Sequence, residues 1–310
     1  MSAEPDLLTA QGHFQRICVY TVLTGCYERL NAQPVAAQSA IPFICLSDDP
    51  QLMAEGWSVR QITPVFPQDP IRNQRELKLR PWLHLGDFDQ SLYIDNSVIL
   101  TATPEAIFER YGIGQSGLTL PHHSFRKTVM DEFLEVSLLG LDDQTRIFEQ
   151  LNHYLVTDAE GLDEQPYWAA VLLRDHRNAD MRRLMEIWWA HVARYSRRDQ
   201  LSFNMACRIA GFTPQAMAID NHQSWFHRWP VSEGRDRQRG PRNPATSLMP
   251  PATRIAVLEK ELQTARLEHL QTFAVLEATR AQLAEARPGN PPAQPPRKSW
   301  RERLFGRDVQ

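Results

Sequence analysis

The stretch SLYIDNSVIL, residues 91–100, decides the fold that the sequence predicts. It opens as a buried strand and runs directly into Asp95, Asn96 and Ser97. In an open α/β sheet, ligands bind beyond the carboxyl ends of the strands, so Asp95 occupies a position where a ligand-binding acid is expected. An Asp-Asn-Ser turn is also common, because these side chains hydrogen-bond to nearby backbone groups. Taken alone, the stretch favours a turn, and only its neighbours favour a binding site.

Strand-like and helix-like stretches alternate from residue 14 to residue 229, which is typical of an α/β domain. Buried strands are expected in RICVYTVLTG (16–25), which ends at Gly25, and in IPFICLSDD (41–49), which ends at Asp48 and Asp49. A basic helix is expected from residue 72 until Pro81, and the strand of residues 91–100 follows it. The sequence therefore predicts one α/β domain over residues 14–229.

Composition narrows the class of function and the location. A net charge of −3 over 310 residues gives no overall attraction to nucleic acid, so no nucleic-acid partner is expected. The four cysteines form no C-x-x-C pair, which favours thiols in a reducing compartment and argues against zinc. The first residues carry no apolar signal segment, and no long apolar stretch follows. We expect a cytoplasmic protein, with a peripheral location at the inner membrane as a further hypothesis.

The composition changes after Trp229. Residues 230–253 are rich in Arg, Pro, Gly and Ser and are predicted to form a disordered linker. Residues 254–287 contain no Gly or Pro, and a 3-4 spacing of apolar side chains predicts a coiled-coil helix that joins copies of the chain into a homo-oligomer. A single solvated helix is the alternative. Residues 288–310 form a Pro-rich and basic tail, in which residues 297–307 fit either peripheral membrane contact or an unstructured segment.

Two basic segments change the interpretation of Asp95. Arg72, Arg75 and Lys78 stand at helical spacing before the strand, and guanidinium and ammonium groups are natural partners of a diphosphate. A solvated basic face is the competing interpretation. Further along, Asp199 and Gln200 stand directly before an apolar helix, where helix capping alone would explain Asp199.

Six segments occur in the order of a known family: VYTVLTGCYERL, FICLSDD, RNQRELKLRPWLHL, SLYIDNSVIL, LPHHSFRKTVMDE and YSRRDQLSFNMACRIAG. Over residues 14–228 the chain resembles the glycosyltransferase-like family first catalogued as a domain of unknown function, which includes plant mucilage and cell-adhesion glycosyltransferase-like proteins. Such proteins resemble GT-A glycosyltransferases. The resemblance implies a Rossmann-like GT-A fold and a nucleotide-sugar donor as substrate.

The resemblance also implies roles for individual residues. The donor is expected to contact the following residues: Tyr20, Thr21, Gly25, Asp48, Asp49, Arg72, Arg75, Lys78 and Asn96. Asp95 matches the first acid of the metal motif, and His123 or its neighbour His122 is a candidate further ligand of Mn²⁺ or Mg²⁺. The usual second acid is replaced by Ser97, which puts metal dependence in question.

Catalytic groups are expected at Asp199, Gln200 and Asp131. A carboxylate there would deprotonate an acceptor hydroxyl in an inverting reaction, or steady the developing positive charge in a retaining one. The sequence leaves both outcomes open. The alternative is a catalytically inactive GT-A-like module that binds nucleotide or glycan and acts as a coiled-coil scaffold. A nucleotidyltransferase or sugar-nucleotide hydrolase that uses the same crevice is a third and weaker hypothesis.

Overall fold

The computed structural model describes residues 16–26, 28–231 and 251–285, which form two units. The first unit is an α/β domain, and the second contains one long helix, α7 (Pro251–Glu285). The predicted tail, and most of the predicted linker, lie outside the described residues.

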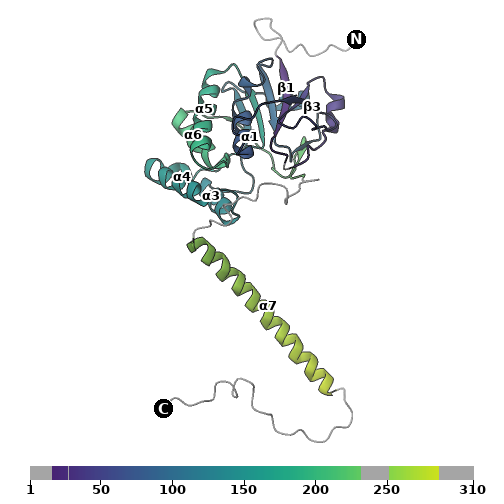
Figure 1. The fold of residues 1–310 in the computed structure, drawn as a ribbon, viewed down its shortest axis with the longest axis vertical. Coiled ribbons are helices and arrows are strands. Elements are labelled where there is room, and N and C mark those ends of the chain that lie inside the picture. Colours follow the sequence, from purple (N-terminus) through teal and green to yellow (C-terminus); the bar gives the residue numbers. More distant parts are fainter. Residues whose placement is uncertain (1–15, 27, 232–250, 286–310) are drawn as a thin grey trace. The chain divides into compact units, whose positions relative to one another are not determined.

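The domain is built on a seven-stranded sheet with the order β3-β2-β1-β4-β7-β6-β8 (Figure 1). Strands β1, β2, β3 and β4 are parallel to one another, whereas β7 is antiparallel to its neighbours β4 and β6. The strands are β1 (Ile17–Leu23), β2 (Phe43–Ser47), β3 (Ser58–Gln61), β4 (Gln90–Ile94), β6 (Leu118–Pro121), β7 (Val171–Asp175) and β8 (Gln215–Met217). The predicted α/β fold class is confirmed.

Strand β1 lies at the point where the strand order reverses. The chain runs from β1 outward to β2 and β3 on one side and returns to β4 on the other. Connections that leave in opposite directions open a crevice beyond the carboxyl ends of the two strands. A ligand is therefore expected to bind beyond the carboxyl ends of β1 and β4.

Helices cover both faces of the sheet. Side chains alternate along β1, so that Tyr20 and Val22 pack towards α1 (Pro70–Leu79), α5 (Ala179–Arg194) and α6 (Gln200–Ala210), while Val19 packs on the opposite side. Figure 1 shows these three helices together on one side of the domain. The opposite face packs on α2 (Pro104–Tyr111) and on the short helix η1 (Pro34–Gln38).

A helical layer adjoins α6. It consists of α3 (Val129–Leu138), α4 (Gln144–Thr157) and the short helix η3 (Ala159–Leu162), which share a small apolar cluster with the first half of α6. The remaining short helix is η2 (Pro81–Leu83), which begins at Pro81, where the predicted basic helix was expected to end.

The stretch 91–100 is not one strand. Strand β4 ends at Ile94, and the chain continues as β5 (Ile99–Leu100), which pairs with β9 (His227–Arg228) in a separate two-stranded sheet. The break is a tight turn, in which Val98 N donates to Asp95 O over 2.9 Å. Asp95 therefore lies in a turn at the end of β4, and a ligand-binding role for it stays a prediction.

Helix α7 begins and ends close to the predicted limits of 254–287. Apolar side chains are exposed on it, including Leu262 and Leu276 at the predicted seam and Leu270 and Phe273 away from it. Pairing with another copy stays a prediction. Within the described part of the chain, no helix combines the length and the apolar character needed to cross a membrane.

Candidate active site

Three loops meet at one edge of the sheet because β1, β2 and β4 are parallel. Gly25 follows β1, Asp48 follows β2 and Asp95 follows β4. The loops contact one another directly, since Gly25 N donates to Asp48 Oδ1 over 3.0 Å. This edge is where the reversal of strand order leads us to expect a ligand.

Gly25 lets the first loop pack against the start of α1. Its φ angle is +79°, and a Cβ atom added there would lie 2.5 Å from Pro70 Cβ. Thr24 Oγ1 also donates to Pro70 O over 2.8 Å. Only glycine combines this backbone conformation with so close a contact at no steric cost.

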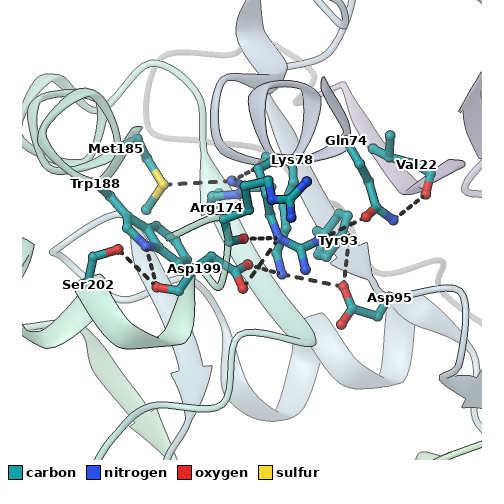
Figure 2. A network of polar contacts seen from close by, with 12 residues as sticks. Val22, Gln74, Lys78, Tyr93, Asp95, Arg174, Met185, Trp188, Asp199 and Ser202 are labelled. Carbon is teal, nitrogen blue, oxygen red and sulfur yellow. Dashed lines mark hydrogen bonds and ion pairs between the residues drawn. The ribbon is translucent and has the colours of Figure 1, made fainter. Parts of the chain in front are cut away.

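Two basic side chains of α1, Arg75 and Lys78, are buried in the domain, and Figure 2 shows Lys78 near Asp199 and Asp95. Lys78 is 1% exposed, and its Nζ lies 2.6 Å from Asp199 Oδ2 and 3.3 Å from Asp95 Oδ1. Arg75 Nε lies 3.4 Å from Asp199 Oδ1. These four side chains form the ion cluster of the site: Arg75, Lys78, Asp95 and Asp199.

Asp199 precedes α6, but its side chain does not cap the helix. Its carboxylate faces Arg75 and Lys78 instead, while Trp188 Nε1 and Ser202 Oγ donate to its backbone oxygen over 2.9 and 3.2 Å. Helix capping therefore does not explain Asp199.

The Asp199 carboxyl is held in its charged form. Burial by itself would raise its pKa, but Arg75, Lys78 and then Arg198 outweigh burial and bring the pKa far below its usual value. A carboxylate with such a low pKa is a weak proton acceptor near neutral pH. Its contacts fit it better for holding the two cations than for removing a proton.

Tyr93 orients the Asp95 carboxylate. Its hydroxyl donates to Asp95 Oδ1 over 2.6 Å. Burial, followed by the charge of Asp95, raises the pKa of Tyr93 well above its usual value, so the hydroxyl keeps its proton. The Asp95 side chain remains 31% exposed. One side of this carboxylate therefore faces solvent while the other is fixed from within.

Arg174 is a site residue that the sequence did not reveal. It lies on β7 with no exposed surface, donates from Nη1 to Lys78 O over 2.7 Å, and also donates to the Tyr20 hydroxyl. Its guanidinium lies 5.6 Å from the ring centre of Tyr20 and 6.0 Å from that of Tyr93. The available signal was a single arginine inside the apolar run VLLRD.

A second ion network holds the segment before Asp199. Asp142 is 2% exposed and accepts from Ser196 Oγ over 2.7 Å and from Arg197 Nη2 over 2.6 Å. Arg197 Nη1 donates to Asp69 Oδ1 over 3.0 Å, and Asp69 caps the start of α1. Arg197 thus links α1 to the segment that carries Asp199.

With this geometry in view, the comparison with protein families is informative. Residues 74–223 match the TOD1/MUCI70 glycosyltransferase-like domain. The resemblance predicted from the six segments is confirmed over this range. The match includes the whole ion cluster, from Arg75 to Asp199, whereas Gly25 and Asp48 precede it.

Three solved glycosyltransferase structures match this chain at low sequence identity and low TM-score. The apo structure of the bifunctional glycosyltransferase WbbM gives a TM-score of 0.41 at 10% identity, over 68% of this chain and 40% of that one. The apo form of mouse xyloside xylosyltransferase 1 gives a TM-score of 0.40 at 9% identity, over 65% of this chain and 84% of that one. The apo form of the glycosyltransferase GlyE of Streptococcus pneumoniae gives a TM-score of 0.38 at 13% identity, over 66% of this chain and 45% of that one. Comparison with curated protein sequences finds no match.

The other residues that are predicted to contact the donor have structural contacts. Tyr20 and Thr21 have no exposed surface, and the Tyr20 hydroxyl donates to Lys78 O over 2.8 Å. Asp49 Oδ1 accepts from Gln51 N over 2.9 Å within a turn. Arg72 Nη2 donates to Tyr195 O over 3.1 Å. Direct contact of these side chains with a donor stays a prediction.

Two of the predicted catalytic residues lie at helix starts. Asp131 is exposed and forms a capping box with Thr128 at the start of α3, so its contacts are those of a helix cap. Gln200 is half-buried and begins α6 beside Asp199. Of the three predicted catalytic residues, only Asp199 lies within the ion cluster.

The side chains around Asp95 do not fit a resident divalent ion. Asn96 is turned towards the loop after β1, where its Oδ1 accepts from Asn31 N over 2.8 Å. Ser97 Oγ accepts from Trp229 Nε1 over 3.1 Å. His123 is 4% exposed, and its ring packs edge-on against Phe125. Among residues 16–26, 28–231 and 251–285, no three His, Cys, Asp or Glu side chains are grouped to hold a metal.

Proposed function

We propose that the α/β domain is a glycosyltransferase that transfers a sugar from a nucleotide-sugar donor to a glycan, lipid or protein acceptor. The observation that carries the proposal is the ion cluster at the crevice between β1 and β4. Lys78 and Arg75 are buried basic groups beside Asp95, on the edge where an open α/β sheet binds ligands. Buried charged groups clustered in a crevice are typical of functional sites.

The cluster suits the departure of a nucleoside diphosphate. Negative charge develops on the leaving diphosphate as the bond to the sugar breaks, and fixed cations in a partly dry site stabilise that charge. In this proposal Arg75 and Lys78 supply the cations, and Asp199 holds them in place. The exposed side of Asp95 accepts hydrogen bonds from donor hydroxyl groups.

The alternative is a catalytically inactive module that binds nucleotide or glycan. One observation favours it, namely that Ser97 replaces the usual second acid and its hydroxyl already accepts from Trp229. Both hypotheses require ligand binding at Asp95, but only the first requires product formation.

Calorimetric titration with UDP- and GDP-sugars, followed by measurement of free nucleoside diphosphate, tests the proposal. We expect binding of at least one donor and its slow hydrolysis, both weakened in Asp95→Asn. Asp163→Asn, at an exposed aspartate, is the matched control. Binding without hydrolysis or transfer would favour the inactive module, and no binding of any nucleotide sugar would contradict both.

We further propose that α7 joins copies of the chain, because leucines along it are exposed. Large apolar side chains exposed along a helix mark surfaces that pack on a partner. The cytoplasmic location, and a contact of residues 297–307 with the membrane surface, remain part of this proposal. The latter residues lie outside the described part of the chain.

A further inference from the structure

Divalent ions that assist diphosphate transfer need oxygen ligands that are both negative and accessible. Mg²⁺ is usually held by one or two carboxylates together with substrate phosphates and water. Here the carboxylate of Asp95 is the sole acid of the motif, and its Oδ1 already contacts Tyr93 and Lys78. The site therefore offers a metal only the exposed side of one carboxylate.

The centre of the site already contains positive charge. The Lys78 ammonium lies 3.3 Å from Asp95 Oδ1 and 4.9 Å from the ring centre of Tyr93. A divalent ion on Asp95 would lie beside this ammonium and be repelled by it. The ion cluster by itself is neutral, with Arg75 and Lys78 against Asp95 and Asp199, and the buried guanidinium of Arg174, which donates to Lys78 O, brings the local charge to +1. Such a cluster attracts an anion rather than a second cation.

Arg198 adds a cation near the ion cluster, since its charge helps to lower the pKa of Asp199 and also acts on the carboxyl of Glu132. The structure gives it no ion pair with any described residue, whereas the neighbouring Arg197 pairs with Asp69 and Asp142. Its Nε is buried and donates to no described acceptor. Buried donors in native proteins normally have a partner, and a phosphate oxygen is a strong one for a guanidinium. Because Arg198 directly precedes Asp199, this donor lies next to the ion cluster.

We propose that this site binds the diphosphate of its donor without a divalent ion, through the side-chain charges of Arg198, Arg75 and Lys78. The inference rests on the proposed function and specifies how that site neutralises its ligand. It also assigns a binding role to Arg198, whose partner would be the leaving diphosphate.

Titration of the full chain with inorganic pyrophosphate in excess EDTA tests this directly. We expect binding in EDTA and a loss of about tenfold in Arg198→Gln, the value of one charge-assisted hydrogen bond. Arg183→Gln, at an exposed arginine of α5, removes the same charge and should leave binding unchanged. Circular dichroism of both variants checks that they are folded. Equal binding by the two variants would refute the role of Arg198.

Two further arms separate this inference from the proposed function. Titration with Mn²⁺ alone, followed by electron paramagnetic resonance, should reveal no site; a site lost in Asp95→Asn would overturn the inference. A nucleotide sugar that binds only when Mn²⁺ is present would keep the proposed function and refute the metal-free site. Pyrophosphate binding in EDTA without binding of any nucleotide sugar would keep the metal-free site and refute the proposed function. Failure of both ligands to bind under all conditions would refute both.

Discussion

The α/β domain and helix α7 distribute charged and apolar side chains in opposite ways. In the domain, Lys78, Arg174 and Asp199 are each at most 3% exposed. In α7, Leu258 is 44% exposed and Leu283 is 64% exposed. Soluble proteins normally bury leucines and expose lysines and aspartates, so both regions depart from the rule.

The difference separates two kinds of function. Burial of charge costs free energy, and it is tolerated where charges pair with one another and act on a ligand. Exposed leucines cost little in an isolated helix, but they are available for contact with another chain. We therefore expect the domain to act on a small anionic ligand and α7 to contact a macromolecular partner.

Lys78→Met should have the largest effect on the free energy of unfolding. It leaves Asp199 charged and buried with one of its two cations removed, and breaking a buried pair in this way typically costs about 3–5 kcal/mol. Guanidinium unfolding of the variant measures the loss. Lys127→Met, at an exposed lysine, is the control.

The double variant Lys78→Met with Asp199→Leu removes both charges. We expect it to recover part of the lost stability, because no unpaired buried carboxylate remains. If Lys78→Met lowers the free energy of unfolding no more than Lys127→Met does, the ion pair does not stabilise the domain.

Asp142→Asn should lower the free energy of unfolding by about 2 kcal/mol at neutral pH, because charge-assisted hydrogen bonds to Ser196 and Arg197 are weakened. Burial would raise the pKa of Asp142, but Arg197 and Ser196 outweigh it and lower the pKa below its usual value. This contribution to stability is therefore complete above about pH 4, the ordinary value for aspartate, and decreases as the pH falls below it.

Urea unfolding at several values between pH 3 and pH 7 measures both effects. The wild type should lose more stability on acidification than Asp142→Asn, and Asp163→Asn should behave like the wild type. Parallel pH profiles for wild type and Asp142→Asn would contradict the low pKa.

Gly25→Ala should lower the free energy of unfolding by about 1–3 kcal/mol, because it forces a side chain into a left-handed backbone conformation and against Pro70. Thermal unfolding measures the expected decrease in the melting temperature. Gly86→Ala is the control, since a Cβ atom there would come no closer than 3.8 Å to Trp82 O. An equal shift in both variants would exclude close packing as the reason for glycine.

Leu262→Glu should leave the stability of the α/β domain unchanged and alter only assembly. If α7 joins copies of the chain, a charge at this seam position disrupts the pairing. Sedimentation should show an oligomer for the wild type and for Gln263→Glu, and a monomer for Leu262→Glu. A monomeric wild type would refute the coiled-coil hypothesis.

Local signals predicted much of the fold. Buried apolar runs predicted β1 and β2, the run of basic residues before Pro81 predicted α1, and an acid after a strand predicted the position of Asp95. Each of these depends on neighbours in the sequence. Lys78 and Asp199 were also selected, each by its own match to the family, but the ion pair between them was not predicted.

Contacts between distant residues were not predicted. Arg174 and Lys78 are separated by 96 positions, and Asp142 and Arg197 by 55. No periodicity links such pairs, because their proximity depends on how whole strands and helices pack. The turn after Ile94 was recognised, but its consequence, the transfer of residues 99 and 100 to another sheet, depends on β9, which is more than 120 residues away.

The hydrogen bonds around Ser97 give this domain a mechanical property. Trp229 Nε1 donates to Ser97 Oγ, and Val231 N donates to Ser97 O over 2.8 Å. Ser97 is two residues from Asp95, so the backbone at residue 231 is tied by a hydrogen bond to the turn that carries Asp95. We therefore expect a displacement of the chain at Val231 to be transmitted to that turn.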